Sequence, residues 1–140
     1  MDPSKIHYPL EQVAQIKAKR LEEAEKVLQE KKKLLATEEE TLKTVEQERD
    51  KVKYHKDAKL QQLRDELDSA STTLKIQQMK QYLKEVDEKL RQREIKVKEQ
   101  QKKVEAAQKA VEEARKEMLK KQQDVEKLKM HRKEMGKREN

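Results

Sequence analysis

The sequence predicts an all-α fold in which two long helices form an antiparallel coiled-coil hairpin. Charged residues make up 46% of the 140 residues, whereas average globular domains carry about 25%. The two prolines are Pro3 and Pro9, and the one glycine is Gly136. No residue from Leu10 to Met135 is therefore a helix breaker. Apolar residues recur at heptad spacing in both halves of the chain. A chain with this many charged residues has too few apolar ones to build a compact core, but enough to line a seam between two helices.

The first predicted helix spans residues 9–68 and follows an N-terminal lead-in at 1–8. Its apolar residues recur in steps of three and four, which places them on one side of a helix. The stripe consists of Leu21, Ala24, Leu28, Leu35, Leu42, Val45, Val52 and Leu63. On the other sides, Glu and Lys often lie three or four residues apart and can pair.

A turn is predicted at residues 69–73, where the heptad phase of the first half stops. Ser69, Ser71, Thr72 and Thr73 are small hydroxyl residues, which compete with helical hydrogen bonds and favour caps and turns. The two halves have different heptad phases, so one continuous seam does not run through the chain. A fold centred on Ser71 pairs positions whose numbers sum to 142 and brings the two stripes together.

The second predicted helix spans residues 74–135, and a C-terminal tail follows at 136–140. Its stripe keeps one phase throughout. It consists of Ile76, Met79, Leu83, Val86, Leu90, Val97, Val104, Ala107, Val111, Ala114, Met118, Val125 and Leu128. Large residues of one stripe face small residues of the other in several layers, which tight packing prefers.

The alternative architecture is a parallel homodimer of one very long helix, which would serve as a structural spacer. An in-register dimer places nine charged seam residues against their own copies, each pair costing a few tenths of a kcal/mol. These are Lys17, Lys31, Glu38, Arg49, Lys56, Lys59, Glu66, Arg93 and Lys121. In the hairpin most of them face an apolar residue, and Arg49 with Arg93 is the one like-charged pair. The hairpin is therefore favoured.

The sequence contains no motif for catalysis. It has no cysteine, no glycine-rich phosphate loop and no nucleophile–base arrangement. Of the three histidines only His7 and His131 could approach each other, and a metal site needs three or four ligands. We therefore expect no enzymatic activity, no catalytic or metal-binding residues and no cofactor. No segment is apolar enough to span a membrane and no signal peptide is present, so we expect a soluble intracellular protein.

The charge is unevenly distributed along the chain. Residues 1–73 carry 15 basic and 16 acidic groups, a net charge of −1, whereas residues 74–140 carry 21 and 13, a net charge of +8. A basic segment can bind nucleic acid, but these lysines alternate with Glu and Gln and no aromatic platform accompanies them. A solvated face or an acidic protein partner fits the pattern better, and a nucleic-acid scaffold is a minor alternative.

Apolar residues outside the seam are candidate protein-binding residues. Near the open end of the hairpin these are Val13, Ile16, Val27, Leu34, Leu119 and Met130. Near the turn they are Leu60, Leu67, Leu74 and Tyr82, with Tyr54 further along. One interpretation is that they only widen the core. Because two helices cannot cover a wide apolar stripe, we expect some of them to be exposed and to bind partners.

Several strings along both predicted helices match a known family. They include Tyr8-Pro9-Leu10, Glu48-Arg49-Asp50-Lys51-Val52, Lys59-Leu60-Gln61-Gln62-Leu63-Arg64, Lys75-Ile76-Gln77-Gln78-Met79-Lys80 and His131-Arg132-Lys133. The match covers nearly the whole chain. The chain resembles the YscO-type members of the FliJ-like family, the central-stalk proteins of the type III secretion ATPase, and is nearest to the chlamydial member.

The resemblance implies an antiparallel hairpin similar to the rotor stalk of rotary ATPases. It also implies that the open end of the hairpin enters the hexameric ATPase ring, that the rest reaches toward the export gate protein, and that the protein binds secretion chaperones. On this chain the open-end group would contact the ATPase and the turn-end group the gate or chaperones. The resemblance places the protein in the bacterial cytoplasm, beside the secretion apparatus at the inner membrane.

Overall fold

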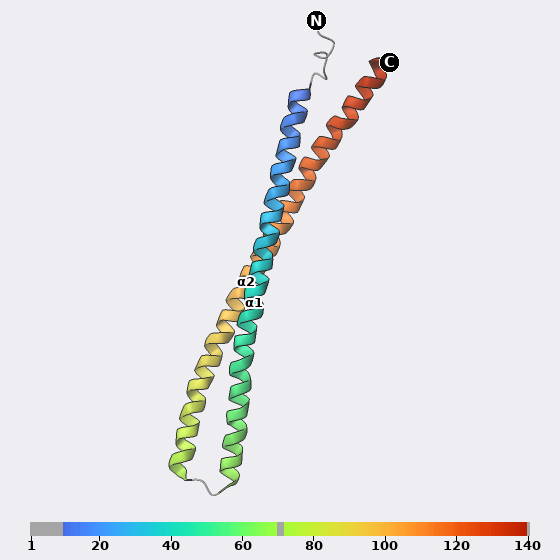
Figure 1. Ribbon diagram of the computed structural model, residues 1–140. Helices are drawn as coiled ribbons and strands as arrows, with labels where there is room; N and C mark the ends of the chain where they lie inside the picture. Colours follow the sequence, from blue (N-terminus) through green and yellow to red (C-terminus); the bar gives the residue numbers. More distant parts are fainter. Residues whose placement is uncertain (1–9, 70–71, 140) are drawn as a thin grey trace. The chain divides into compact units, whose positions relative to one another are not determined.

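Two helices make up the part of the chain that the computed structural model describes, residues 10–69 and 72–139 (Figure 1). Helix α1 spans Glu11–Asp68 and α2 spans Thr73–Glu139, with no strand among the described residues. Ion pairs join the beginning of α1 to the end of α2 and the end of α1 to the beginning of α2. The fold is therefore the predicted all-α hairpin, and not one long uninterrupted helix.

The observed bounds of α2 differ from the expected ones at both ends. The helix begins at Thr73, one residue early, and continues through Gly136 to Glu139, so the expected tail at 136–140 is wrong for residues 136–139. Gly136 does not adopt the positive φ with which a glycine ends a helix. Without that conformation, a glycine costs a helix only about 1 kcal/mol relative to alanine. The expected lead-in at 1–8 and Pro9 lie outside the described residues.

Thr72 starts α2 with a side-chain cap. Its hydroxyl accepts a hydrogen bond from the backbone N–H of Lys75 at 3.3 Å, and its carbonyl accepts one from Ile76 at 3.2 Å. This is the N-cap arrangement that threonine favours, because the hydroxyl satisfies an N–H that has no partner within the helix. At the end of α1, the hydroxyl of Ser69 donates to the carbonyl of Glu66 at 3.2 Å.

The hairpin divides into two units, each made of one segment of α1 and one of α2. Unit 1 combines Met1–Leu35 with Ala107–Asn140, and unit 2 is Ala36–Ala106. Within each unit the two helical segments lie side by side in opposite directions (Figure 1).

The core of both units is the seam predicted from the heptads. Every residue of the two predicted stripes is buried or half-buried. The buried apolar residues in unit 1 are Leu28, Ala107 and Val111, and those in unit 2 are Val52, Leu83, Val86, Val97 and Val104. No large side chain among the described residues is less than 2% exposed. The core is therefore a single layer of side chains between the two helices.

Interhelical ion pairs show the register in which the helices pair. In unit 1, Lys17 lies 3.5 Å from Asp124 and Glu11 lies 3.0 Å from Arg132. In unit 2, Lys56 lies 2.6 Å from Asp87. The residue numbers of these pairs add up to 141 or 143, next to the sum of 142 expected from a fold centred on Ser71.

The two arginines expected to form a like-charged layer each have a carboxylate partner. Arg93 lies 3.3 Å from Glu48 across the seam, and Arg49 lies 3.0 Å from the neighbouring Asp50. The positive charges are therefore compensated at the edge of the seam, where both guanidinium groups remain partly exposed.

Candidate protein-binding surfaces

The six open-end candidates are all exposed in unit 1, from 39% for Val13 to 64% for Met130. Four of them lie on α1 and form one stripe, which we call the open-end stripe: Val13, Ile16, Val27 and Leu34. Their spacings of 3, 11 and 7 residues are those of positions on one side of a helix.

The open-end stripe runs along one edge of the seam. Val13, Val27 and Leu34 each directly precede a seam residue, namely Ala14, Leu28 and Leu35. The seam residues are buried or half-buried against α2, whereas the preceding residues remain exposed. Exposed aliphatic side chains in a row at helical spacing are typical of a surface to which another chain binds.

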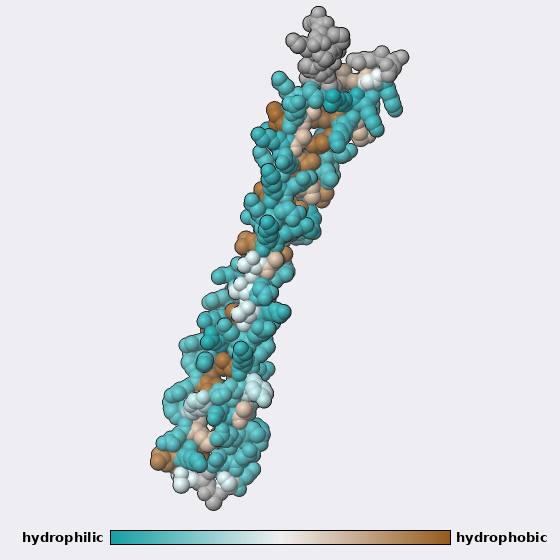
Figure 2. Space-filling model, in the orientation of Figure 1, coloured by the Kyte–Doolittle hydropathy of each residue, from teal (hydrophilic) through white to brown (hydrophobic). Residues whose placement is uncertain are grey.

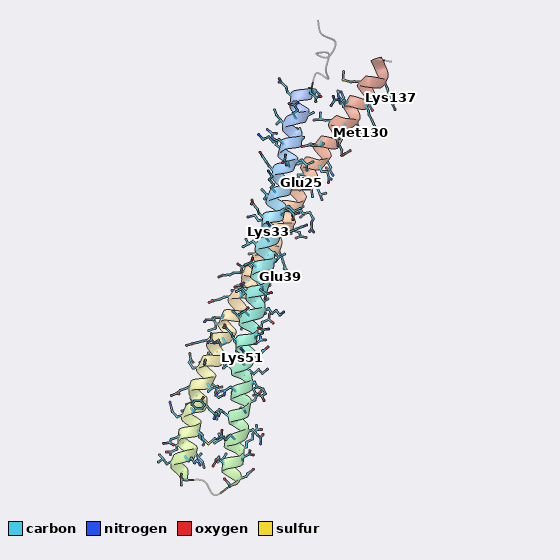
Figure 3. The ribbon with its side chains drawn as sticks, in the orientation of Figure 1. Glu25, Lys33, Glu39, Lys51, Met130 and Lys137 are labelled. Atoms are coloured by element: carbon cyan, nitrogen blue, oxygen red, sulfur yellow. The ribbon has the colours of Figure 1, made fainter. Side chains whose placement is uncertain are left out.

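Leu119 and Met130 belong to a separate patch on α2. They are eleven residues apart, about three helical turns, and so share one side of that helix. Met130 follows the half-buried Leu128 by two residues, which turns its side chain about 200° around the helix, away from α1. Figure 3 marks Met130 near the C-terminal end of α2.

The turn-end candidates do not form one surface. Leu67, Leu74 and Tyr82 are exposed, whereas Leu60 is half-buried. Leu60 and Leu67 are seven residues apart on α1 and share a side of it. Tyr82 instead contacts His55, which is five residues, or about 140° of rotation, from Leu60. The structure therefore separates Tyr82 from these two leucines.

Tyr82 is the centre of a polar cluster in unit 2. Its hydroxyl lies 2.7 Å from Nε2 of His55, and the two rings meet edge to face, with centroids 5.8 Å apart and planes at 81°. Nζ of Lys59 lies 5.6 Å from the centre of the tyrosine ring, within the range of a cation–π interaction. These contacts hold the ring of Tyr82 across the groove between α1 and α2.

Two hollows lie in this groove, one on each side of Tyr82. The hollow nearer the turn has a volume of about 250 Å³ and is lined by Lys59, Gln62, Lys75, Gln78, Met79, Tyr82 and Leu83. The other has a volume of about 390 Å³ and is lined by Lys51, Val52, His55, Tyr82, Glu85, Val86 and Lys89. We call the two hollows together the Tyr82 groove. None of Leu60, Leu67 and Leu74 lines it.

Sequence reasoning placed His55 far from the other two histidines, gave it no role and missed its contact with Tyr82. A signal was available, because His55 and Tyr82 each directly precede a seam residue, Lys56 and Leu83. Such positions flank the same edge of an antiparallel pair. Gln100, which is 6% exposed, and the exposed Ile95 were missed as well.

The described residues contain no group of three or more His, Cys, Asp or Glu side chains that could hold a metal ion. His7, the one histidine that could approach His131 according to the sequence, lies outside the described residues. No helix in the described part of the chain has an apolar stretch long enough to cross a membrane. The face drawn in Figure 2 is mainly hydrophilic, with hydrophobic residues in small separate patches.

Comparison with known proteins decides the family. The family model described as YscO-like protein matches residues 5–139, almost the entire chain. The chain belongs to the YscO-like family. This family is associated with type III secretion, which agrees with the resemblance found in the sequence strings.

A solved structure supports the same assignment for this YscO-like protein. The structure of a YscO homologue, CT670 from Chlamydia trachomatis, is 44% identical in sequence and superimposes with a TM-score of 0.89. The alignment covers 95% of this chain and 82% of the chlamydial chain. The comparison with curated proteins found no match.

Proposed function

We propose that this YscO-like protein is a non-enzymatic stalk and adaptor of a type III secretion ATPase. In this proposal unit 1 binds the hexameric ATPase ring, and the turn end of unit 2 binds the export gate protein and secretion chaperones. The protein would work in the bacterial cytoplasm, beside the secretion apparatus at the inner membrane. A hairpin suits this role because it can join an ATPase to a second partner by binding alone.

The observation that carries the ATPase part is the open-end stripe. Ile16 is 51% exposed and Leu34 is 47% exposed, although both lie next to the seam. Burying such side chains against a partner contributes roughly 25 cal/mol for each Å² of apolar area removed from water. Four such residues on one side of α1, together with Leu119 and Met130 on α2, give unit 1 exposed apolar surface on both helices.

The charge of unit 1 supports the same assignment and describes the partner. Residues 10–35 and 107–139 contain 18 Lys and Arg against 12 Asp and Glu, a net charge of +6. Residues 36–106 contain 17 and 16, a net charge of +1. The expected binding surface on the ATPase ring is therefore acidic with apolar recesses. Complementary charge of this kind mainly speeds association.

The test is stimulation of the cognate ATPase by the purified protein. The double variant Ile16→Asp with Leu34→Asp places two charges in the open-end stripe and is expected to abolish stimulation. The matched control is Gln15→Asp with Gln29→Asp, two exposed residues on the other side of α1, which is expected to stimulate normally. Circular dichroism checks that both variants remain helical. Normal stimulation by the stripe variant would contradict the proposed ATPase surface.

The turn-end assignment needs a separate binding experiment. Leu67→Asp with Leu74→Asp changes two exposed side chains near the turn. It is expected to weaken binding to the gate protein or a chaperone, measured by titration calorimetry, and to leave ATPase stimulation intact. Equal binding by this variant and the wild type would remove Leu67 and Leu74 from the proposed surface.

A further inference from the structure

We infer that the Tyr82 groove binds an acidic amphipathic helix of a partner protein, which lies along α1 and α2 as a third helix. In this arrangement two apolar side chains of the partner, seven residues apart, enter the hollows on either side of Tyr82. The inference rests on the proposed function of the turn end and adds the chemistry of the partner that binds there.

The floor of each hollow is apolar and already ordered. Met79 and Leu83 contribute to the hollow nearer the turn, and Val52 and Val86 to the other. Leu83, Val52 and Val86 are seam residues between 6% and 9% exposed, so the backbone on both sides is held by the core. An apolar side chain that enters such a hollow loses contact with water without requiring the hairpin to rearrange.

The rim of the groove is basic. Four of its residues are lysines, Lys51, Lys59, Lys75 and Lys89, and one is acidic, Glu85. Lys75 lies 3.8 Å from Glu66, whereas among the described residues Lys51, Lys59 and Lys89 make no ion pair. Figure 3 marks Lys51 on α1. Lys59 also donates a hydrogen bond to Gln62 at 3.2 Å and lies over the Tyr82 ring. The ammonium groups of Lys51 and Lys89 therefore remain for carboxylates of a partner, which makes a negatively charged partner the expected one.

The spacing of the hollows selects a helix. Met79 and Val86, one in each hollow, are seven residues apart on α2, so the hollows are about 10 Å apart. Two residues seven apart on a bound helix have the same separation and point the same way. An extended strand could reach both hollows, but its backbone N–H and C=O groups would find no sheet edge here to pair with.

The groove does not suit a second copy of this chain as the occupant. Packed groove to groove, two copies would bring their lysine rims together, and like charges at close range destabilise an interface. Nucleic acid would satisfy the charge but would leave the two apolar floors uncovered, and a single tyrosine is not a stacking platform for successive bases.

The probe is a synthetic 22-residue helical peptide, labelled with fluorescein, with leucines at heptad spacing on one face and glutamates elsewhere. Titration of the full-length protein is expected to give saturable 1:1 binding by fluorescence anisotropy. Replacing the glutamates of the peptide by lysine, or its leucines by glutamine, is expected to weaken binding at least tenfold. Either altered peptide binding as tightly as the probe would overturn the inference.

The matched pair of protein variants locates the site. Lys51→Glu with Lys89→Glu reverses two charges on the rim and is expected to weaken peptide binding at least tenfold. Lys80→Glu with Lys84→Glu reverses two exposed charges on the other side of α2 and is expected to bind within twofold of the wild type. Equal weakening by both pairs would show general charge attraction and would overturn the assigned groove.

Further outcomes separate this inference from its rivals and from the proposed function. A doubled mass in light scattering that Lys51→Glu with Lys89→Glu abolishes would identify a second copy as the occupant, and tighter binding of duplex DNA than of the peptide would identify nucleic acid. Either result overturns the inference.

The variant Lys51→Glu with Lys89→Glu is expected to stimulate the ATPase normally. If the wild-type protein stimulates the ATPase but does not bind the peptide, the inference alone is refuted. If the wild-type protein binds the peptide but does not stimulate the ATPase, the stalk role alone is refuted.

Discussion

The side-chain amide of Gln100 donates a hydrogen bond, 3.0 Å long, to the backbone carbonyl oxygen of Glu38 on the facing helix, and it also reaches the carboxylate of Glu38. Gln100 is 6% exposed and lies in a seam whose neighbouring layers hold Val97 and Val104. A buried polar contact within a seam specifies which residues face each other, at some cost in stability. We therefore assign this contact to the register of unit 2.

Replacing Gln100 by leucine is expected to raise the free energy of unfolding by about 1 kcal/mol, because an apolar side chain then fills the seam. The carboxylate of half-buried Glu38 can turn to water, so little is lost when its partner is removed. Thermal unfolding by circular dichroism measures the change, expected as a rise of a few degrees in Tm. A lower Tm would mean that the hydrogen bonds stabilise unit 2 more than apolar packing does.

Val97→Ala is expected to destabilise the protein by about 1–2 kcal/mol. Val97 is 3% exposed, and its truncation removes buried methyl groups from a core that cannot collapse around the gap. The control is Ile95→Ala, two residues away on α2, where the side chain is 50% exposed. That change is expected to stay within about 0.5 kcal/mol. Urea unfolding measures the free energy of unfolding of the two variants. Similar decreases in both would contradict the observation that Val97 is buried and Ile95 is exposed.

Thr72→Ala removes the hydroxyl that accepts from the N–H of Lys75 and is expected to cost about 1 kcal/mol. Thr73→Ala, at the first helical residue, is the matched control and is expected to be nearly neutral. Hydrogen exchange of the amides at the start of α2 reports the local effect, with faster exchange for Thr72→Ala alone. Equal exchange rates in both variants would contradict the assignment of Thr72 as the N-cap of α2.

The Arg93–Glu48 pair is expected to couple the two helices weakly. Its side chains are 29% and 45% exposed, so water and salt screen the 3.3 Å contact. A double-mutant cycle with Arg93→Ala and Glu48→Ala is expected to give a coupling of about 0.5 kcal/mol, which falls further at 1 M salt. A coupling that is unchanged by salt would show that the pair is more deeply desolvated than its exposure indicates.

Much of the fold could be predicted from residue types and their spacing. The heptad positions predicted the seam, and Leu28, Val97 and Val111 are buried as expected. The turn region and the register near a sum of 142 agree with the observed ion pairs. The predicted end of α2 before Gly136 was wrong. A glycine in the left-handed conformation ends a helix, and Gly136 does not adopt that conformation, which the residue type alone does not reveal.

The candidate surfaces were predicted less completely. The exposure of Ile16, Leu34 and Met130 follows from their positions outside the heptad seam, and the structure agrees. Leu60 is half-buried, although it too lies outside the seam. The grouping of Tyr82 with the turn-end leucines did not predict its actual neighbours, because spacing along one helix does not identify the side chains of the other helix.

The sequence by itself determined that the chain is helical, where it turns, which side of each helix is buried and which family it belongs to. Those properties depend on contacts near in sequence and on periodicity, both of which are visible in the residues. Only the tertiary structure decided that His55 and Lys59 on α1 meet Tyr82 on α2 and that a hollow lies on each side of the ring. Such contacts depend on the rotation and register of two helices to within one residue, and on side-chain lengths that no heptad pattern specifies.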